Sequence, residues 1–186
     1  TQWDWVELDV KFKERYGNLR VNMVLLVGNS LCLLTDKNDI KKSLTNIKSI
    51  LAPGGVLLID ERNFDYILGD IDKILEDPIS NFRYNGDVIY CGDLVRGVPT
   101  DKPEDKDIVV FSYYRIPQSE QEEMDSYKIL ERNLIGKLEM YPFKNNELKN
   151  LLESVGFVNI KTYSDFEEGY NKNADFFIYV AEVPST

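Results

Sequence analysis

The sequence predicts an α/β fold in which a parallel sheet carries an antiparallel β insertion. Across residues 1–78, nearly continuous apolar runs alternate with amphipathic helical patterns, an order typical of a parallel sheet with right-handed crossovers. Across residues 79–143 the runs are strand-like and separated by acidic loops, which indicates an antiparallel insertion. Residues 144–186 return to the α/β pattern, with one helix and two strands that close the core.

The first part of the core contains three predicted strands and two predicted helices. Residues 3–8 alternate two tryptophans with polar positions, which favours a short strand. The run RVNMVLLVG at residues 20–28 is almost wholly apolar, as expected of a strand covered on both faces. A helix follows at residues 39–51, where isoleucines and leucines recur at helical spacing with lysines opposite. Residues 56–60 (VLLID) form a second buried strand, and residues 63–75 a second helix.

The insertion contains three strand-like runs, and the closing segment contains one helix. The runs DVIYCGD, IVVFSYYRI and SYKILERNLIGKLEMY occupy residues 87–93, 108–116 and 126–141. Residues 145–156 have leucines at helical spacing and end at Gly156, the expected helix cap. Two strands follow, at residues 158–163 and 175–182.

Composition excludes several classes of function. The 186-residue chain carries a formal net charge of −10, which argues against nucleic acid as a main partner because phosphate backbones require clustered Lys and Arg. No apolar run reaches the ~18–20 residues of a membrane span, and the first residues do not form a signal peptide. The chain has no histidine, which excludes Ser-His-Asp triads and histidine-based metal sites, and its 2 cysteines cannot make a structural zinc site alone. The sparse cysteines favour a reduced, cytoplasmic location.

Polar side chains follow the two buried strands where each strand ends. The turn GNS at residues 28–30 follows the first strand, and Arg62 follows the second. In an open α/β sheet, ligands bind outside the carboxyl ends of the strands. Asn29 offers an amide and Arg62 a fixed fork of donors, which together suit a carboxylate. Taken one at a time they have simpler explanations: a strand-to-helix turn, and a surface ion pair.

The same stretches resemble the glycine N-methyltransferase group, which includes glycine/sarcosine and sarcosine/dimethylglycine methyltransferases. The resemblance rests on GNSL at residues 28–31 and on NIKSILAPGGVLLIDERNFDYIL at residues 46–68. It extends to DW at residues 4–5, to the tyrosine-bearing insertion and to VGFVNIKTYSDF at residues 155–166. It implies part of a class I methyltransferase (Rossmann-like) sheet that uses S-adenosylmethionine.

The resemblance implies cofactor-binding roles for two short segments. The positions concerned are Asp4, Trp5, Val27, Gly28, Ser30 and Leu33. Residues 4–5 would contact the adenine end of S-adenosylmethionine. Val27, Gly28 and Ser30 would lie against its methionine and sugar. Leu33 stands where the animal glycine enzymes carry a histidine, so this contact is altered.

The resemblance also implies a small amino-acid substrate. Asn29 and Arg62 would hold its carboxylate, and Tyr90 and Tyr113 would lie as catalytic residues near the amine and the transferring methyl. Methyl transfer from a sulfonium is a one-step displacement that depends largely on positioning, so it needs no histidine base. The implied activity is N-methylation of glycine and/or sarcosine, toward betaine as an osmolyte. A sarcosine/dimethylglycine enzyme and a non-catalytic α/β binding fragment stay as alternatives, and a homo-oligomer stays open.

The chain departs from the family before Gly28. No G-x-G-x-G-like loop and no strand-end acid for the ribose precede this residue. Class I sheets have the strand order 3-2-1-4-5-7-6, so two absent strands would separate the strand at residues 3–8 from the one at residues 20–28. Central strands cannot be left out, because their neighbours' backbone groups would be unpaired. We therefore expect the C-terminal part of a longer enzyme, completed by an N-terminal segment or a second chain.

Overall fold

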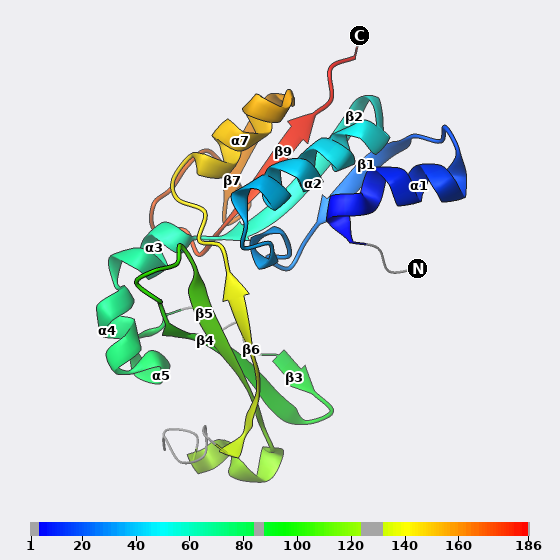
Figure 1. The fold of residues 1–186 in the computed structure, drawn as a ribbon. Coiled ribbons are helices and arrows are strands. Elements are labelled where there is room, and N and C mark those ends of the chain that lie inside the picture. Colours follow the sequence, from blue (N-terminus) through cyan, green and yellow to red (C-terminus); the bar gives the residue numbers. More distant parts are fainter. Residues whose placement is uncertain (1–3, 84–87, 124–131, 186) are drawn as a thin grey trace. The chain divides into compact units, whose positions relative to one another are not determined.

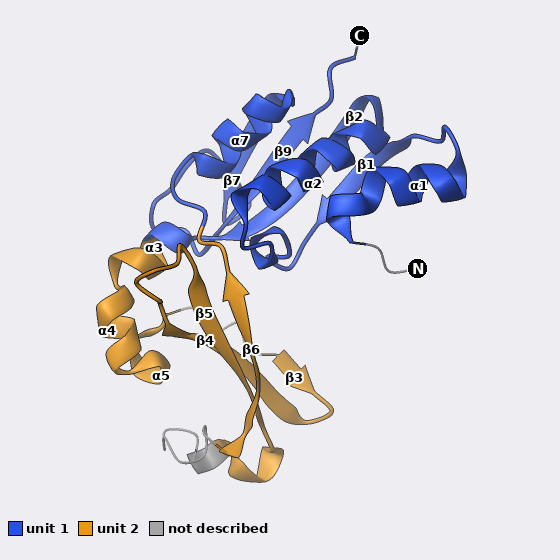
Figure 2. Ribbon diagram, in the orientation of Figure 1, with its two compact units in different colours: residues 1–65, 143–186 blue, residues 66–142 orange. Residues whose placement is uncertain are grey.

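The computed structural model of the chain describes residues 4–83, 88–123 and 132–185. The chain forms two compact units, coloured separately in Figure 2: unit 1 comprises residues 1–65 and 143–186, and unit 2 comprises residues 66–142. Among the described residues, no helix is long and apolar enough to cross a membrane.

The sequence pattern places the first boundary after residue 78, whereas in the structure unit 2 already begins at residue 66. Helices α4 (Ile71–Glu76) and α5 (Pro78–Asn81) pack against strand β4 (Asp93–Asp101), which belongs to unit 2. The predicted single helix over residues 63–75 is instead two helices, α3 (Phe64–Gly69) and α4, separated at Asp70.

Unit 1 is built on a five-stranded sheet in the order β1-β2-β9-β7-β8 (Figure 1). The strands are β1 (Val21–Leu26), β2 (Leu51–Arg62), β9 (Phe176–Glu182), β7 (Val158–Ser164) and β8 (Glu167–Glu168). The predicted parallel pair is confirmed, because β1 and β2 run in the same direction. Strand β9 lies between β2 and β7 and runs antiparallel to both. In the described part of the chain, β1 stands at an edge of the sheet.

The helices of unit 1 are α1 (Leu8–Tyr16), α2 (Lys37–Ile50) and α7 (Glu147–Val155). Helix α2 begins at Asp36, whose carboxylate accepts hydrogen bonds from the N–H groups of Asn38 (2.8 Å) and Asp39 (3.1 Å). Its apolar face is buried as the spacing predicts. Helix α7 ends at Gly156, which has φ of 90°, a left-handed conformation that suits a glycine cap.

One face of this sheet is covered and the other is open among the described residues. Figure 1 shows α2 and α7 on the same side of the sheet. Along β2, the residues facing that side (Leu57, Ile59 and Glu61) are buried, whereas the residues between them are half-buried. On β1, Met23 and Leu25 are 55% and 56% exposed. Both faces of the sheet carry apolar residues, but among the described residues no element covers the face opposite to α2 and α7.

The strand expected at residues 3–8 is wrong; Trp3 itself lies outside the described residues. The side chain of Asp4 accepts a hydrogen bond from the N–H of Val6 (2.9 Å) and begins a 3-10 helix at Trp5–Glu7, which continues into α1. An aspartate at this position satisfies a helix N-terminus that a strand would not have. The alternation of two tryptophans covered too few residues to outweigh this cap.

Without that strand, the expected gap inside the sheet does not arise. The observed order β1-β2-β9-β7 agrees with positions 4-5-7-6 of the order that the family resemblance implies. Further strands of that order would add at the edge formed by β1, next to the exposed side chains of Met23 and Leu25.

Unit 2 contains a four-stranded sheet in the order β3-β4-β5-β6. Strands β3 (Val88–Tyr90), β4, β5 (Val109–Ile116) and β6 (Leu134–Met140) pair antiparallel throughout, as the sequence predicts for the insertion. A 3-10 helix at Gln118–Glu123 follows β5. The long strand-like run before residue 141 is a strand from Leu134 onward; its residues 126–131 lie outside the described part of the chain.

Candidate active site

The carboxyl ends of β1 and β2 are joined by a hydrogen bond. After β1 the chain turns at Gly28 (φ 75°) and Asn29 (φ 54°), both in the left-handed region that glycine and asparagine adopt most readily. The backbone N–H of Asn29 donates to Oδ1 of Asp60 at 3.0 Å. The expectation that the two strands end side by side is therefore confirmed, and the tight turn is what brings Asn29 back onto β2.

Arg62 is the last residue of β2 and lies two positions beyond Asp60, on the same face of the strand. The residue is half-buried, and its Nε and Nη1 atoms are themselves buried. A buried guanidinium needs an anion nearby, and two of its five donors suit a carboxylate. The turn with Asn29 and the guanidinium of Arg62 thus lie at the same edge of the sheet. Their role as a carboxylate clamp stays a prediction.

Four of the six predicted cofactor positions line one cavity of unit 1. The cavity has a volume of about 250 Å³ and is lined by Asp4, Trp5, Ser30, Leu33 and Leu34. It is formed where the N-terminal 3-10 helix faces the 3-10 helix at Leu31–Leu33, which follows β1. Leu34 was not predicted as a cofactor position, although this residue continues the apolar run that contains Leu33. Val27 and Gly28 adjoin this segment along the chain but do not line the cavity.

The lining of this cavity suits one end of a flat heteroaromatic ligand. Trp5 and the leucines supply an apolar wall, and Asp4 supplies a carboxylate, one oxygen of which already accepts a hydrogen bond from the N–H of Val6. Binding sites for ligands of cofactor size usually enclose roughly 300–1,000 Å³. A cavity of about 250 Å³ therefore forms one part of such a site rather than the whole.

A buried acid lies directly behind these strand ends. Glu61 alternates with its neighbours Asp60 and Arg62, so its side chain enters the covered face, where it is 2% exposed. Burial raises the pKa of Glu61 to about 8, and it raises the pKa of the Cys32 thiol well above its usual range. Sequence reasoning missed Glu61, although the two-residue period of the strand already places it on the buried face.

The predicted catalytic tyrosines lie in unit 2 on different strands. Tyr90 ends β3 and is exposed, with the guanidinium carbon of Arg115 5.3 Å from the centre of its ring. Tyr113 lies on β5, opposite Gly97 of β4. A Cβ atom at Gly97 would lie 2.6 Å from the ring of Tyr113, so glycine is needed for the ring to rest there. The nearness of either tyrosine to a transferring methyl stays a prediction.

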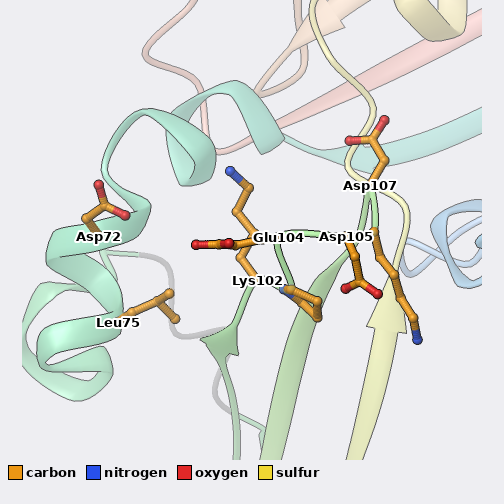
Figure 3. A pocket seen from close by; sticks show the side chains of 8 residues that line it. Asp72, Leu75, Lys102, Glu104, Asp105 and Asp107 are labelled. Atoms are coloured by element: carbon orange, nitrogen blue, oxygen red, sulfur yellow. The ribbon is translucent and has the colours of Figure 1, made fainter.

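Unit 2 also contains a larger cavity, of about 490 Å³, which none of the predicted site residues lines. Figure 3 shows Asp72 and Leu75 of α4 on one side and the loop after β4 on the other. That loop supplies the residues Lys102, Pro103, Glu104, Asp105, Lys106 and Asp107. Within the described residues, no group of three or more acidic, cysteine or histidine side chains could hold a metal ion. Because its acids and lysines are intermixed on a surface loop, we place the chemistry at the strand ends instead.

Comparison with known proteins supports the family resemblance. The chain is 30% identical over 180 residues to the glycine/sarcosine N-methyltransferase of Aphanothece halophytica, a match that covers 96% of this chain and 56% of that protein. It is 30% identical over 181 residues to the glycine/sarcosine N-methyltransferase of Halorhodospira halochloris, covering 97% of this chain and 55% of that protein. No protein-family model matches the chain. The chain thus spans about half the length of the curated relatives it matches.

Among solved structures, the fold is similar to that of an S-adenosylmethionine-dependent methyltransferase from Clostridium acetobutylicum. The TM-score is 0.56 at 12% sequence identity, over 90% of this chain and 60% of that chain. The predicted fold is therefore confirmed: the chain has the α/β architecture of part of a class I methyltransferase. The sequence similarity to glycine/sarcosine N-methyltransferases confirms the resemblance deduced from the motifs.

Proposed function

We propose that this chain is part of an enzyme that transfers methyl groups from S-adenosylmethionine to the nitrogen of glycine and/or sarcosine. The observation that carries the proposal is 30% identity to glycine/sarcosine N-methyltransferases over 96% of the chain. Repeated methylation of glycine nitrogen leads to betaine, so the proposed product class is an osmolyte. The free thiols of Cys32 and Cys91 support a cytoplasmic location.

The cavity beside Asp4 and Trp5 is the proposed contact surface for the adenosyl end of the cofactor. Trp5 and Leu33 offer apolar surface to a ring, and the second carboxylate oxygen of Asp4 can accept from an exocyclic amine. When bound, the cofactor supplies a methyl group on a sulfonium centre, which a nitrogen lone pair can displace. The turn at Gly28 and Asn29 leads from β1 directly toward this cavity, so the same segment contacts both ligands.

The acceptor is proposed to bind at the strand ends. Arg62 supplies charge and a bidentate fork for the carboxylate, and Asn29, fixed through Asp60, supplies a neutral donor. Holding one end of so small a molecule orients its amine, and such positioning can contribute up to ~7–11 kcal/mol to catalysis in favourable cases. Tyr90 and Tyr113 are proposed to surround the amine, because aromatic faces and phenol oxygens stabilise a positively charged methyl and ammonium group.

A further segment is proposed to complete the sheet along β1. Edge strands with exposed apolar side chains are prone to pair with other strands, and Met23, Leu25 and Val27 are 55%, 56% and 58% exposed. The relatives are nearly twice as long as their match to this chain, so they contain enough residues to supply the segment. It would also supply the glycine-rich loop and the ribose-binding acid, whether joined covalently or as a second chain.

The proposal is tested by methyl-transfer assays on the protein completed with that segment. Glycine, sarcosine and dimethylglycine are offered separately with S-adenosylmethionine, and methylated products are identified by mass spectrometry. We expect turnover with glycine, sarcosine or both. Turnover with dimethylglycine but not glycine assigns the enzyme to the later methylation steps. Failure to methylate all three while the cofactor still binds would show that the acceptor assignment is wrong.

A further inference from the structure

Glu61 is a buried acid that the proposed contacts to cofactor and acceptor leave unused. It is the second-last residue of β2, and its side chain projects into the covered face of the sheet, opposite to Arg62. Burial of a polar side chain costs free energy unless its groups are hydrogen-bonded, so an apolar residue would be the default here. The contacts of Glu61 indicate a role for an acid at this position.

Those contacts link both strand ends. Oε1 of Glu61 accepts a hydrogen bond from the backbone N–H of Arg62 at 3.2 Å. The thiol of Cys32 and the carboxyl group of Glu61 lie near enough that each shifts the pKa of the other, whereas Oε2 of Glu61 has no hydrogen-bond partner among the described residues. The single S–H group of Cys32 donates to the carbonyl oxygen of Asn29, at 2.9 Å. A path of contacts therefore runs from Asn29 through Cys32 and Glu61 to Arg62.

The environment of Glu61 keeps its carboxyl group neutral at neutral pH. Burial raises its pKa to about 8, and the charge of Asp60 acts in the same direction, while Arg62 and the Cys32 thiol oppose it. Tyr179 of β9 also faces the carboxyl group. A neutral Glu61 therefore adds no negative charge beside the guanidinium of Arg62.

We propose that Glu61 is a positioning residue: together with Cys32, it holds the Asn29 turn and Arg62 in the geometry that binds the carboxylate of the acceptor. This inference rests on the function proposed above for Asn29 and Arg62. Glu61 itself touches neither acceptor nor cofactor. Its loss removes one of the contacts that fix the two strand ends, which stay joined by the hydrogen bond from Asn29 to Asp60, and this weakens acceptor binding more than the transfer step.

The first test compares steady-state kinetics of the completed protein with those of three variants. Glu61→Leu removes the hydrogen-bonding group, and we expect the KM for the amino acid to rise roughly tenfold or more, with kcat and the KM for S-adenosylmethionine changed less than about threefold. Cys32→Ala should shift the same KM in the same direction. Ser43→Ala is the matched control: Ser43 is fully buried in α2 and its Oγ has no hydrogen-bond partner, so kinetics should stay unchanged.

The second test uses pH, which a merely structural role would not affect. Glu61→Gln keeps an oxygen that accepts from Arg62 and cannot ionise. In the unsubstituted protein, ionisation of Glu61 above about pH 8 places a negative charge beside Arg62 that competes with the acceptor carboxylate, so the KM for the amino acid should rise. Glu61→Gln should lack this rise, whereas titration of the acceptor's own amine affects both proteins equally.

Each of the two tests has an outcome that would overturn the positioning role of Glu61. An unchanged amino-acid KM in Glu61→Leu overturns the positioning role. If Glu61→Leu does not fold, as judged by circular dichroism, the pH comparison decides, and coincident KM profiles of the unsubstituted protein and Glu61→Gln overturn the proposal. An unsubstituted protein that methylates no amino acid overturns the proposed function and this inference with it, which separates that failure from failure of the positioning role alone.

Discussion

Replacement of Glu61 by glutamine should change the pH dependence of folding stability by an amount that the structure predicts. Burial raises the pKa of Glu61 from 4.5, its ordinary value, to about 8 in the folded chain. The folded state therefore holds a proton that the unfolded state releases between these two values. The contribution of Glu61 to stability is fully present below about pH 4.5 and is lost progressively as the pH rises to about 8.

The magnitude follows from the gap between the two pKa values. A gap of about 3.5 pKa units, at about 1.36 kcal/mol per unit, corresponds to ~5 kcal/mol. Glutamine does not titrate, so Glu61→Gln should lack this loss of stability. Between about pH 5 and pH 9, the free energy of unfolding of the unsubstituted chain should fall by ~4–5 kcal/mol relative to that of Glu61→Gln. Urea unfolding followed by circular dichroism across this range measures the difference.

The control is Glu153→Gln on the exposed surface of α7, which makes the same exchange of side chain away from the buried site. Cys32 and Tyr179 are present in all three proteins, and burial raises the pKa of both groups, so neither ionises in the folded chain within this pH range. Parallel profiles for Glu61→Gln and the unsubstituted chain would show instead that the carboxyl group of Glu61 is hydrated and ionised in the folded state.

Two further predictions concern the ligand contacts. Arg62→Lys keeps the charge but loses the bidentate fork, so we expect the KM for the amino acid to rise about tenfold or more while cofactor affinity is little changed; near-normal kinetics in this variant would exclude Arg62 as the carboxylate anchor. Asp4→Ala removes the acceptor that lines the cavity beside Trp5, so calorimetry on the completed protein should show weaker binding of S-adenosylmethionine, by roughly tenfold. Unchanged affinity would mean that Asp4 serves only as the cap of the N-terminal 3-10 helix.

The parallel pair of strands could be predicted because its signals are local and strong. The apolar runs of β1 and β2 flank a helix with a regular apolar face, and only a parallel crossover accommodates that order. The ends of two parallel neighbours then meet at one edge of the sheet. The hydrogen bond from Asn29 to Asp60 is the direct consequence.

Features that depend on contacts distant in sequence could not be predicted in the same way. The backbone of Trp5 and Val6 accepts hydrogen bonds from the amide of Asn46, some 40 residues away, which stabilises a helical start where alternation suggested a strand. The packing of α4 and α5 on β4 likewise determines where unit 2 begins. Glu61 is intermediate: its burial follows from strand period, but its link to Cys32 depends on how the segment after β1 folds back.

We propose that this chain supplies the acceptor clamp and one wall of the cofactor site, and that catalysis needs a further segment along β1. The most direct test measures S-adenosylmethionine binding and methylation of glycine and sarcosine by the 186-residue chain alone and by the same chain joined to, or mixed with, the completing segment. We predict little or no cofactor binding and no turnover for the chain alone, and both activities once the segment is added. Methylation by the 186-residue chain alone at the rate of the completed protein would exclude the need for a further segment, because a full cofactor site would then lie within these residues.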